Sequence, residues 1–166
     1  MKIAFTLILA ALGAIGYPAL AANACCEEQE FRGVGVSPDG VKIQLVEVKR
    51  VSPEDIRVTW ALRNTSDKPQ VLTLGQGASW SDKFKLAYDA NLLDSGSRLK
   101  IKVAKDQKGD LVAASHQPDM RAKGIVLGPG KTLTTWAKFI APERVKRVSV
   151  DLPGATMPWE GVEVVQ

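Results

Sequence analysis

The sequence predicts an all-β domain, and three observations lead to this prediction. Apolar and polar residues alternate over several short stretches, of which Ile56–Arg63 is the clearest, and this period is typical of half-buried strands. Clusters of Gly, Pro, Asn, Asp and Ser separate the stretches. No long stretch has the roughly 3.6-residue apolar period of a helix that packs on a core. We therefore expect about eight or nine short strands in a sandwich or barrel.

The expected strands follow from this alternation. They cover Val41–Val51 with a change of phase after Leu45, Ile56–Arg63, Val71–Leu74, Leu99–Val103, Ile125–Leu127, Leu133–Phe139, Val148–Leu152 and Val162–Val165. Phe84, Leu86 and Tyr88 also alternate, so we predict a strand there rather than a short helix from Asp82. Residues 105–122 are polar and are expected to form a hairpin or a long loop.

Residues 1–24 have the composition of a secretory signal peptide. Lys2 precedes an apolar run over Ile3–Ile15, Pro18 ends the run, and Ala-x-Ala patterns follow, the second directly before Cys25. The run is shorter than the about 20 residues that a membrane-spanning helix needs. We therefore expect cleavage of this segment and export of the protein to the periplasm or the medium.

The exported part is expected to contain a tether and one domain. Residues 25–40 are polar, rich in Glu and Gly, and end in the turn sequence Asp39-Gly40. We interpret them as a flexible N-terminal tether. Residues 41–166 then form the β-sandwich domain, and their number is enough to bury a core.

Cys25 and Cys26 are adjacent. Neighbouring Cα atoms lie about 3.8 Å apart, whereas a disulfide prefers about 5.5–6 Å, so we expect no structural disulfide within the domain. Three alternatives stay open: a Cys-linked dimer, free thiols, or lipidation of Cys25. Bacterial lipoprotein signals resemble this layout, although Ala22 stands where they usually carry Leu. Only lipidation would attach the protein to a membrane.

A basic stripe is expected on one face of the strand near residue 100. Arg98, Lys100 and Lys102 share one phase of the alternation, while Leu99 and Ile101 are expected to face the core. The stripe is a candidate contact for an anionic partner, such as lipid head groups, anionic glycans or an acidic protein. The alternative interpretation is that the lysines protect an edge strand from unwanted pairing.

Composition limits the class of partner only weakly. The formal net charge of +4 permits an anionic partner without requiring one. Nucleic acid is not an expected partner, because no aromatic residues interleave with the basic stripe as stacking platforms would.

Two tryptophans are candidate binding residues because they fall in predicted loops. Trp80 lies between Gly77 and Ser81, and Trp159 follows Pro158. Tryptophan is favoured at binding hot spots, although a loop tryptophan can equally pack over the end of a sandwich.

Catalytic and metal-binding motifs are weak. His116 is the only histidine, and a catalytic dyad or a zinc site needs several partners. His116 and Met120 could offer a soft metal two ligands, although a solvated loop histidine is favoured. Gly128–Thr132 is similar to the end of a phosphate-binding P-loop, but the first glycine and the following helix are missing. We therefore expect neither enzymatic activity nor a cofactor.

Two segments carry a resemblance to known proteins. Trp60-Ala61-Leu62-Arg63-Asn64-Thr65-Ser66-Asp67-Lys68-Pro69 resembles the strand and turn of bacterial exported immunoglobulin-like domains. The segment from Ala141 to Val162, with Leu152-Pro153-Gly154 and Pro158-Trp159-Glu160, resembles the closing strands of small envelope sandwich domains that accompany OmpA-like proteins. The resemblance implies an immunoglobulin-like β-sandwich in the cell envelope and transfers no catalytic residues.

The resulting hypothesis is a non-enzymatic exported envelope module that binds another protein or an envelope polymer. The alternative hypothesis is a periplasmic carrier of a small ligand or metal that uses His116 and Met120.

Overall fold

The computed structural model describes residues 27–33, 36, 39–73, 79 and 81–166. The predicted signal peptide, the two cysteines and Trp80 lie outside these residues. Within them, the chain forms ten strands and one short 3₁₀ helix, so the all-β prediction is confirmed. The elements are β1 (Glu28–Glu30), β2 (Val41–Ser52), β3 (Asp55–Asn64), β4 (Gln70–Leu72), η2 (Lys85–Ala87), β5 (Asn91–Asp94), β6 (Lys100–Lys102), β7 (Ile125–Leu127), β8 (Thr132–Ile140), β9 (Arg147–Asp151) and β10 (Trp159–Glu163).

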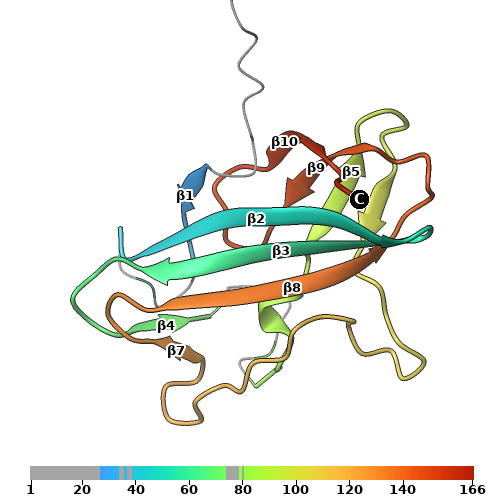
Figure 1. Cartoon of the computed structure of the whole chain (residues 1–166). Coiled ribbons are helices and arrows are strands. Elements are labelled where there is room, and N and C mark those ends of the chain that lie inside the picture. The colour runs from blue at the N-terminus through green and yellow to red at the C-terminus, as the bar shows by residue number, and fades with distance from the viewer. Residues whose placement is uncertain (1–26, 34–35, 37–38, 74–78, 80) are drawn as a thin grey trace, which may run out of the picture.

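The strands form two four-stranded antiparallel sheets and one small ribbon. The first sheet has the order β1-β2-β3-β8, the second has the order β10-β9-β5-β6, and β4 pairs with β7. In Figure 1, β2, β3 and β8 lie side by side in front, with β5, β9 and β10 behind them. No helix among the described residues is long and apolar enough to span a membrane.

The core lies between the two sheets and is built from alternate residues of their strands. In β3, the side chains of Ile56, Val58, Trp60 and Leu62 are buried, while Arg57 and Arg63 are exposed. This is the pattern that a period of two dictates when one face of a strand is covered.

A β-bulge explains the change of phase in the second strand. Leu45 pairs with Trp60 and Glu47 pairs with Thr59, so Val46 is an extra residue on β2. A bulge moves the following side chains to the opposite phase. As a result Val46 is exposed and Val48 returns to the core.

The two sheets are joined at both edges. At one edge Val103 bridges to Phe139 of β8, and the amide of Ala104 donates a 2.7 Å hydrogen bond to the carbonyl of Lys138. At the other edge Val165 bridges to Lys49 of β2 in parallel orientation. These bridges satisfy backbone groups that open edges would expose.

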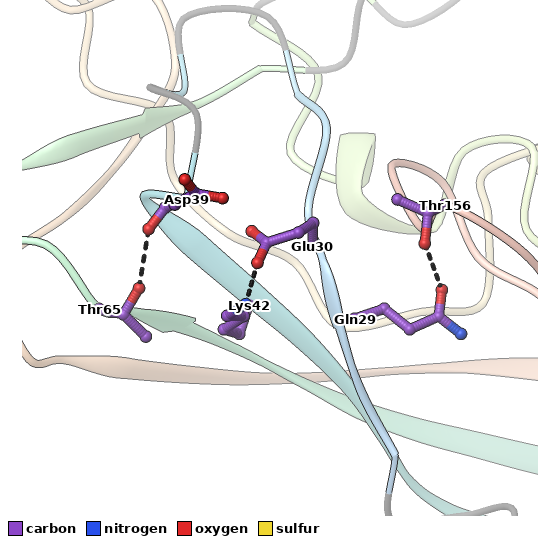
Figure 2. Close-up of polar contacts among 6 residues, drawn as sticks. All are labelled: Gln29, Glu30, Asp39, Lys42, Thr65 and Thr156. Carbon is purple, nitrogen blue, oxygen red and sulfur yellow. Dashed lines mark hydrogen bonds and ion pairs between the residues drawn. The ribbon is translucent and has the colours of Figure 1, made fainter.

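The predicted flexible tether over residues 25–40 is wrong for the part that the structure describes. Residues 28–30 form β1, which pairs with β2. Figure 2 shows the two sides of this strand: Glu30 forms an ion pair with Lys42, and Gln29 accepts a 3.0 Å hydrogen bond from Thr156. Phe31 then enters the core. The segment is ordered because both its backbone and its side chains find partners on the domain.

One other local prediction is wrong. Phe84, Leu86 and Tyr88 do not form a strand; instead a 3₁₀ turn covers Lys85–Ala87. Asp82 Oδ1 accepts a 2.8 Å hydrogen bond from the amide of Phe84 at the start of this turn, and such side-chain contacts compete with strand pairing.

We expect Gly154→Ala to destabilise the domain more than Gly109→Ala. Both glycines have a positive φ, +82° and +85°, so alanine is strained at either position, by about 1–2 kcal/mol. A Cβ at Gly154 would also lie 2.4 Å from Cε2 of Phe31, whereas nothing lies within 4 Å at Gly109. Urea denaturation of both variants measures the difference. Equal losses would show that Phe31 does not pack against Gly154.

Candidate functional site

The candidate site is a cavity of about 420 Å³ at the side of the second sheet. It is lined by strand residues of β5, β6 and β9, by the segment after η2, and by the hairpin that follows β6. The lining residues are Ala87, Tyr88, Asp89, Ala90, Asn91, Lys100, Lys102, Val103, Lys105, Leu111 and Asp151. Its volume falls within the range of about 300–1,000 Å³ that ligand pockets have.

The register of three strands places the polar floor of the cavity. Asn91 of β5 pairs with Lys102 of β6 on one side and with Asp151 of β9 on the other. Residues that pair across neighbouring strands share a face of the sheet. Lys102, Asn91 and Asp151 therefore form one row, which we name the polar row, on the face away from the core.

Asn91 is held by its neighbours although it faces away from the core. Its side-chain Nδ2 donates to the carbonyl of Asp89 at 3.1 Å and to Oδ2 of Asp151 at 3.0 Å. Because both N–H groups are engaged, Oδ1 is the amide atom left to accept a hydrogen bond from a ligand. Asn91 is only 8% exposed, so this acceptor has a defined position.

Three lysines form the cationic side of the cavity. Lys100 and Lys102 lie on the exposed side of β6, and Lys105 follows in the hairpin that its backbone bridge to Leu111 closes. Among the described residues, none of these three ammonium groups forms an ion pair with a carboxylate. Asp89 and Asp151 also line the cavity, so its lining keeps a surplus of one positive charge.

The structure corrects one member of the predicted basic stripe. Arg98 lies in the turn between β5 and β6 with φ +56°, so the alternation of the strand does not extend to it. Leu99, expected in the core, is 45% exposed for the same reason. Arg98 is also absent from the lining of the cavity. Lys100 and Lys102 are the two stripe residues that the structure brings together.

Asp94 organises the turn that leads into β6. Its carboxylate accepts hydrogen bonds from the amides of Gly96 and Ser97, both at 3.2 Å, and from the Ser97 hydroxyl. These bonds, the one from the Ser97 hydroxyl above all, lower the pKa of Asp94 because they favour its charged form. The turn sets where β6 begins, and with it the position of the lysines.

The predicted role of Trp159 as an exposed contact residue is wrong. Trp159 begins β10 and is 2% exposed. Its Nε1 donates a 3.1 Å hydrogen bond to the carbonyl of Glu27. The indole is therefore part of the core and cannot reach a partner. Trp80 lies outside the described residues.

His116 and Met120, the candidate metal ligands, have different surroundings. The His116 ring hydrogen-bonds to Oγ1 of Thr135 in β8 at 3.0 Å, and the His116 amide donates to the carbonyl of Lys83. Met120 is 71% exposed in the turn that Asp119 and Gly124 close. The described residues contain no cluster of three or more His, Cys, Asp or Glu side chains that could hold a metal ion.

A second depression, of about 430 Å³, lies on the outer face of the first sheet. It is lined by Glu28, Lys42, Gln44, Ala61, Arg63, Gly130 and Thr132. Lys42 already forms an ion pair with Glu30 (Figure 2). The depression therefore offers less uncompensated positive charge than the cavity beside β6.

Sequence reasoning missed Asn91 and Asp151, which supply hydrogen-bond acceptors to the cavity. Asn91 and Asp151 are distant in the chain, and only the pairing of β5 with β9 brings them together. Asp89 carries a sequence signal, because Asp tolerates the left-handed conformation better than most residues; its φ is +65°. That signal indicates a turn and does not indicate a site.

The comparisons with known proteins give no relative. No protein-family model, no curated protein and no solved structure matches the chain.

We expect stability to fall below about pH 6.5, the ordinary pKa of histidine, and His116 to cause part of this loss. Burial lowers the pKa of His116, so the unfolded state binds its proton first as the pH falls. The stability that neutral His116 contributes is complete above the unfolded pKa and is lost as the pH falls through the folded pKa. Urea midpoints at about pH 7.5 and about pH 5.5 measure the change.

His116→Gln is the comparison for this prediction, because glutamine does not titrate and His116 is the only histidine. The variant should lose less stability than the parent protein between the two pH values. Identical pH dependence in the two proteins would contradict a lowered pKa at this position.

Proposed function

We propose that the protein is a non-enzymatic exported module that binds an anionic component of the cell envelope, a protein or a polymer. The observation that carries the proposal is the set of three lysines, Lys100, Lys102 and Lys105, which line one cavity and form no ion pair among the described residues. With Asp89 and Asp151 also in the lining, the cavity keeps a surplus of one positive charge, and such a surplus attracts ligands of the opposite sign.

The shape of the cavity supports binding rather than simple protection of an edge strand. Lysines that only deter strand pairing need no cavity beside them. Here Asn91 and Asp151 line the cavity opposite the lysines, and a hydrogen bond fixes one to the other. Few and well-placed polar groups are typical of specific binding sites.

The proposal also includes the type of sandwich and the cellular location of the protein. We propose an immunoglobulin-like sandwich in the broad sense, supported by two antiparallel four-stranded sheets. Its central β2–β3 hairpin differs from the A-B-E-D order of immunoglobulin sheets. We propose export on the signal-like sequence of residues 1–24. Lipidation of Cys25, free thiols and a Cys-linked dimer remain the alternatives for the cysteines.

The alternative function, a carrier that uses His116 and Met120, has less support. The Nε2 atom of His116 is hydrogen-bonded to Thr135, and Met120 points from an exposed turn. A histidine that is engaged by the protein is less available as a ligand to a metal.

We expect the double variant Lys100→Glu/Lys102→Glu to lose binding of anionic oligomers. Reversing two charges on the cavity wall should weaken the affinity roughly tenfold to a hundredfold. NMR titration with oligogalacturonate and with polyglutamate measures both affinity and location. In the parent protein the shifts should centre on the amides of Lys100, Lys102 and Asn91, and affinity should fall from about 20 to about 300 mM salt.

Lys68→Glu/Lys123→Glu is the matched control. Both lysines are exposed, lie outside the cavity and change the net charge by the same amount. This variant should bind almost as the parent protein does. Equal losses in the two double variants, or an affinity that salt does not change, would refute the cavity as the binding site.

A further inference from the structure

We infer that the ligand of the cavity is an acidic saccharide, a sugar that carries a carboxylate together with several hydroxyl groups, as in a uronic acid polymer. The inference rests on the proposed function, because it names the anionic component that the lysines bind. Its basis is the division of the cavity wall into a donor half and an acceptor half.

The donor half is formed by the ammonium groups of Lys100, Lys102 and Lys105. An ammonium group donates three hydrogen bonds and accepts none. This half therefore suits a carboxylate, and it has no acceptor to offer to a hydroxyl or an amine.

The acceptor half is formed by Asp89, Asn91 and Asp151. Asp151 uses Oδ2 to bind Asn91, and its ionised carboxylate has further acceptor positions. The Asn91 amide presents Oδ1, because its Nδ2 is engaged on both sides. A ligand at this half must donate several hydrogen bonds, as neighbouring sugar hydroxyls do.

The two halves lie close enough for one sugar residue to contact both. Lys102 and Asp151 are on the strands either side of Asn91, so their Cα atoms lie about 10 Å apart at the usual strand spacing. The flexible lysine side chain shortens this span. A polymer of one charge with few donors, such as polyphosphate, would meet the two carboxylates at the same place.

The charge of the lining also matches this class of ligand. Three lysines and two aspartates line the cavity, which leaves one positive charge. A uronic acid residue carries one negative charge, whereas a zwitterion or a neutral sugar carries no net charge and would leave this positive charge uncompensated. Val103 and Leu111 add apolar surface to the lining, against which the C–H face of a sugar ring can pack.

The experiment compares three probes by calorimetry on the parent protein: oligogalacturonate, a neutral gluco-oligosaccharide of equal length, and polyglutamate. Oligogalacturonate has carboxylates and hydroxyls, whereas each of the other probes has only one of the two. We expect oligogalacturonate to bind at least about tenfold more tightly than either, the effect of one charge-assisted hydrogen bond per site.

Asp151→Asn is expected to affect the affinities for oligogalacturonate and for polyglutamate differently. The variant keeps an oxygen that can accept from Asn91 and removes one negative charge. If Asp151 accepts sugar hydroxyls, its loss should weaken oligogalacturonate binding by about tenfold, while polyglutamate binds equally well or better. Asp67→Asn, an exposed carboxylate outside the cavity, is the matched control and should leave oligogalacturonate binding unweakened.

The outcomes separate the inference from the proposed function. If Asp151→Asn strengthens the binding of both anions, or if the neutral oligosaccharide binds as tightly as oligogalacturonate, the acidic saccharide is overturned. If Asp151→Asn strengthens the binding of both anions, the anion-binding function survives as long as Lys100→Glu/Lys102→Glu still weakens that binding. If neither anion binds at the lysines, both are overturned.

Discussion

The geometry of the site depends on one constraint, the register in which β6, β5 and β9 pair. On the core side of these strands, Ile101, Leu92 and Val150 form a row of buried apolar side chains. A shift of one residue would expose this row to water. Because side chains alternate, the register that buries the apolar row also places the polar row of Lys102, Asn91 and Asp151 outside. Hydrophobic burial thus positions the polar groups of the cavity.

The connection after β6 adds the rest of the cavity wall. The chain leaves the second sheet at Val103, bridges to β8, and turns in the hairpin that Lys105 and Leu111 close. It then continues along β8 in the same direction as before the hairpin, and Ala113 bridges to Ala137. One connection therefore joins the two sheets at this edge and brings a third ammonium group beside those of β6.

Much of the fold could be predicted from the sequence, and half of the site could not. The alternation in Val41–Val51 and Ile56–Arg63 indicated the central hairpin, and the change of phase after Leu45 corresponds to the bulge. Lys100 and Lys102 were found because their spacing is local. Asn91 and Asp151 were missed because pairing between distant strands has no local signal. Trp159 was misjudged because Pro158 indicated a loop, whereas the indole is buried by strands from elsewhere.

The bridge between Lys49 and Val165 has a consequence for the kinetics of folding. It joins residues from opposite ends of the domain, and β3 likewise pairs with a strand far along the chain. Such contacts form only after long loops have closed, so folding is slow in proteins of this topology, on the order of milliseconds to seconds. The first sheet can therefore be completed only after the last part of the chain has reached it, because both β8 and Val165 come from that part.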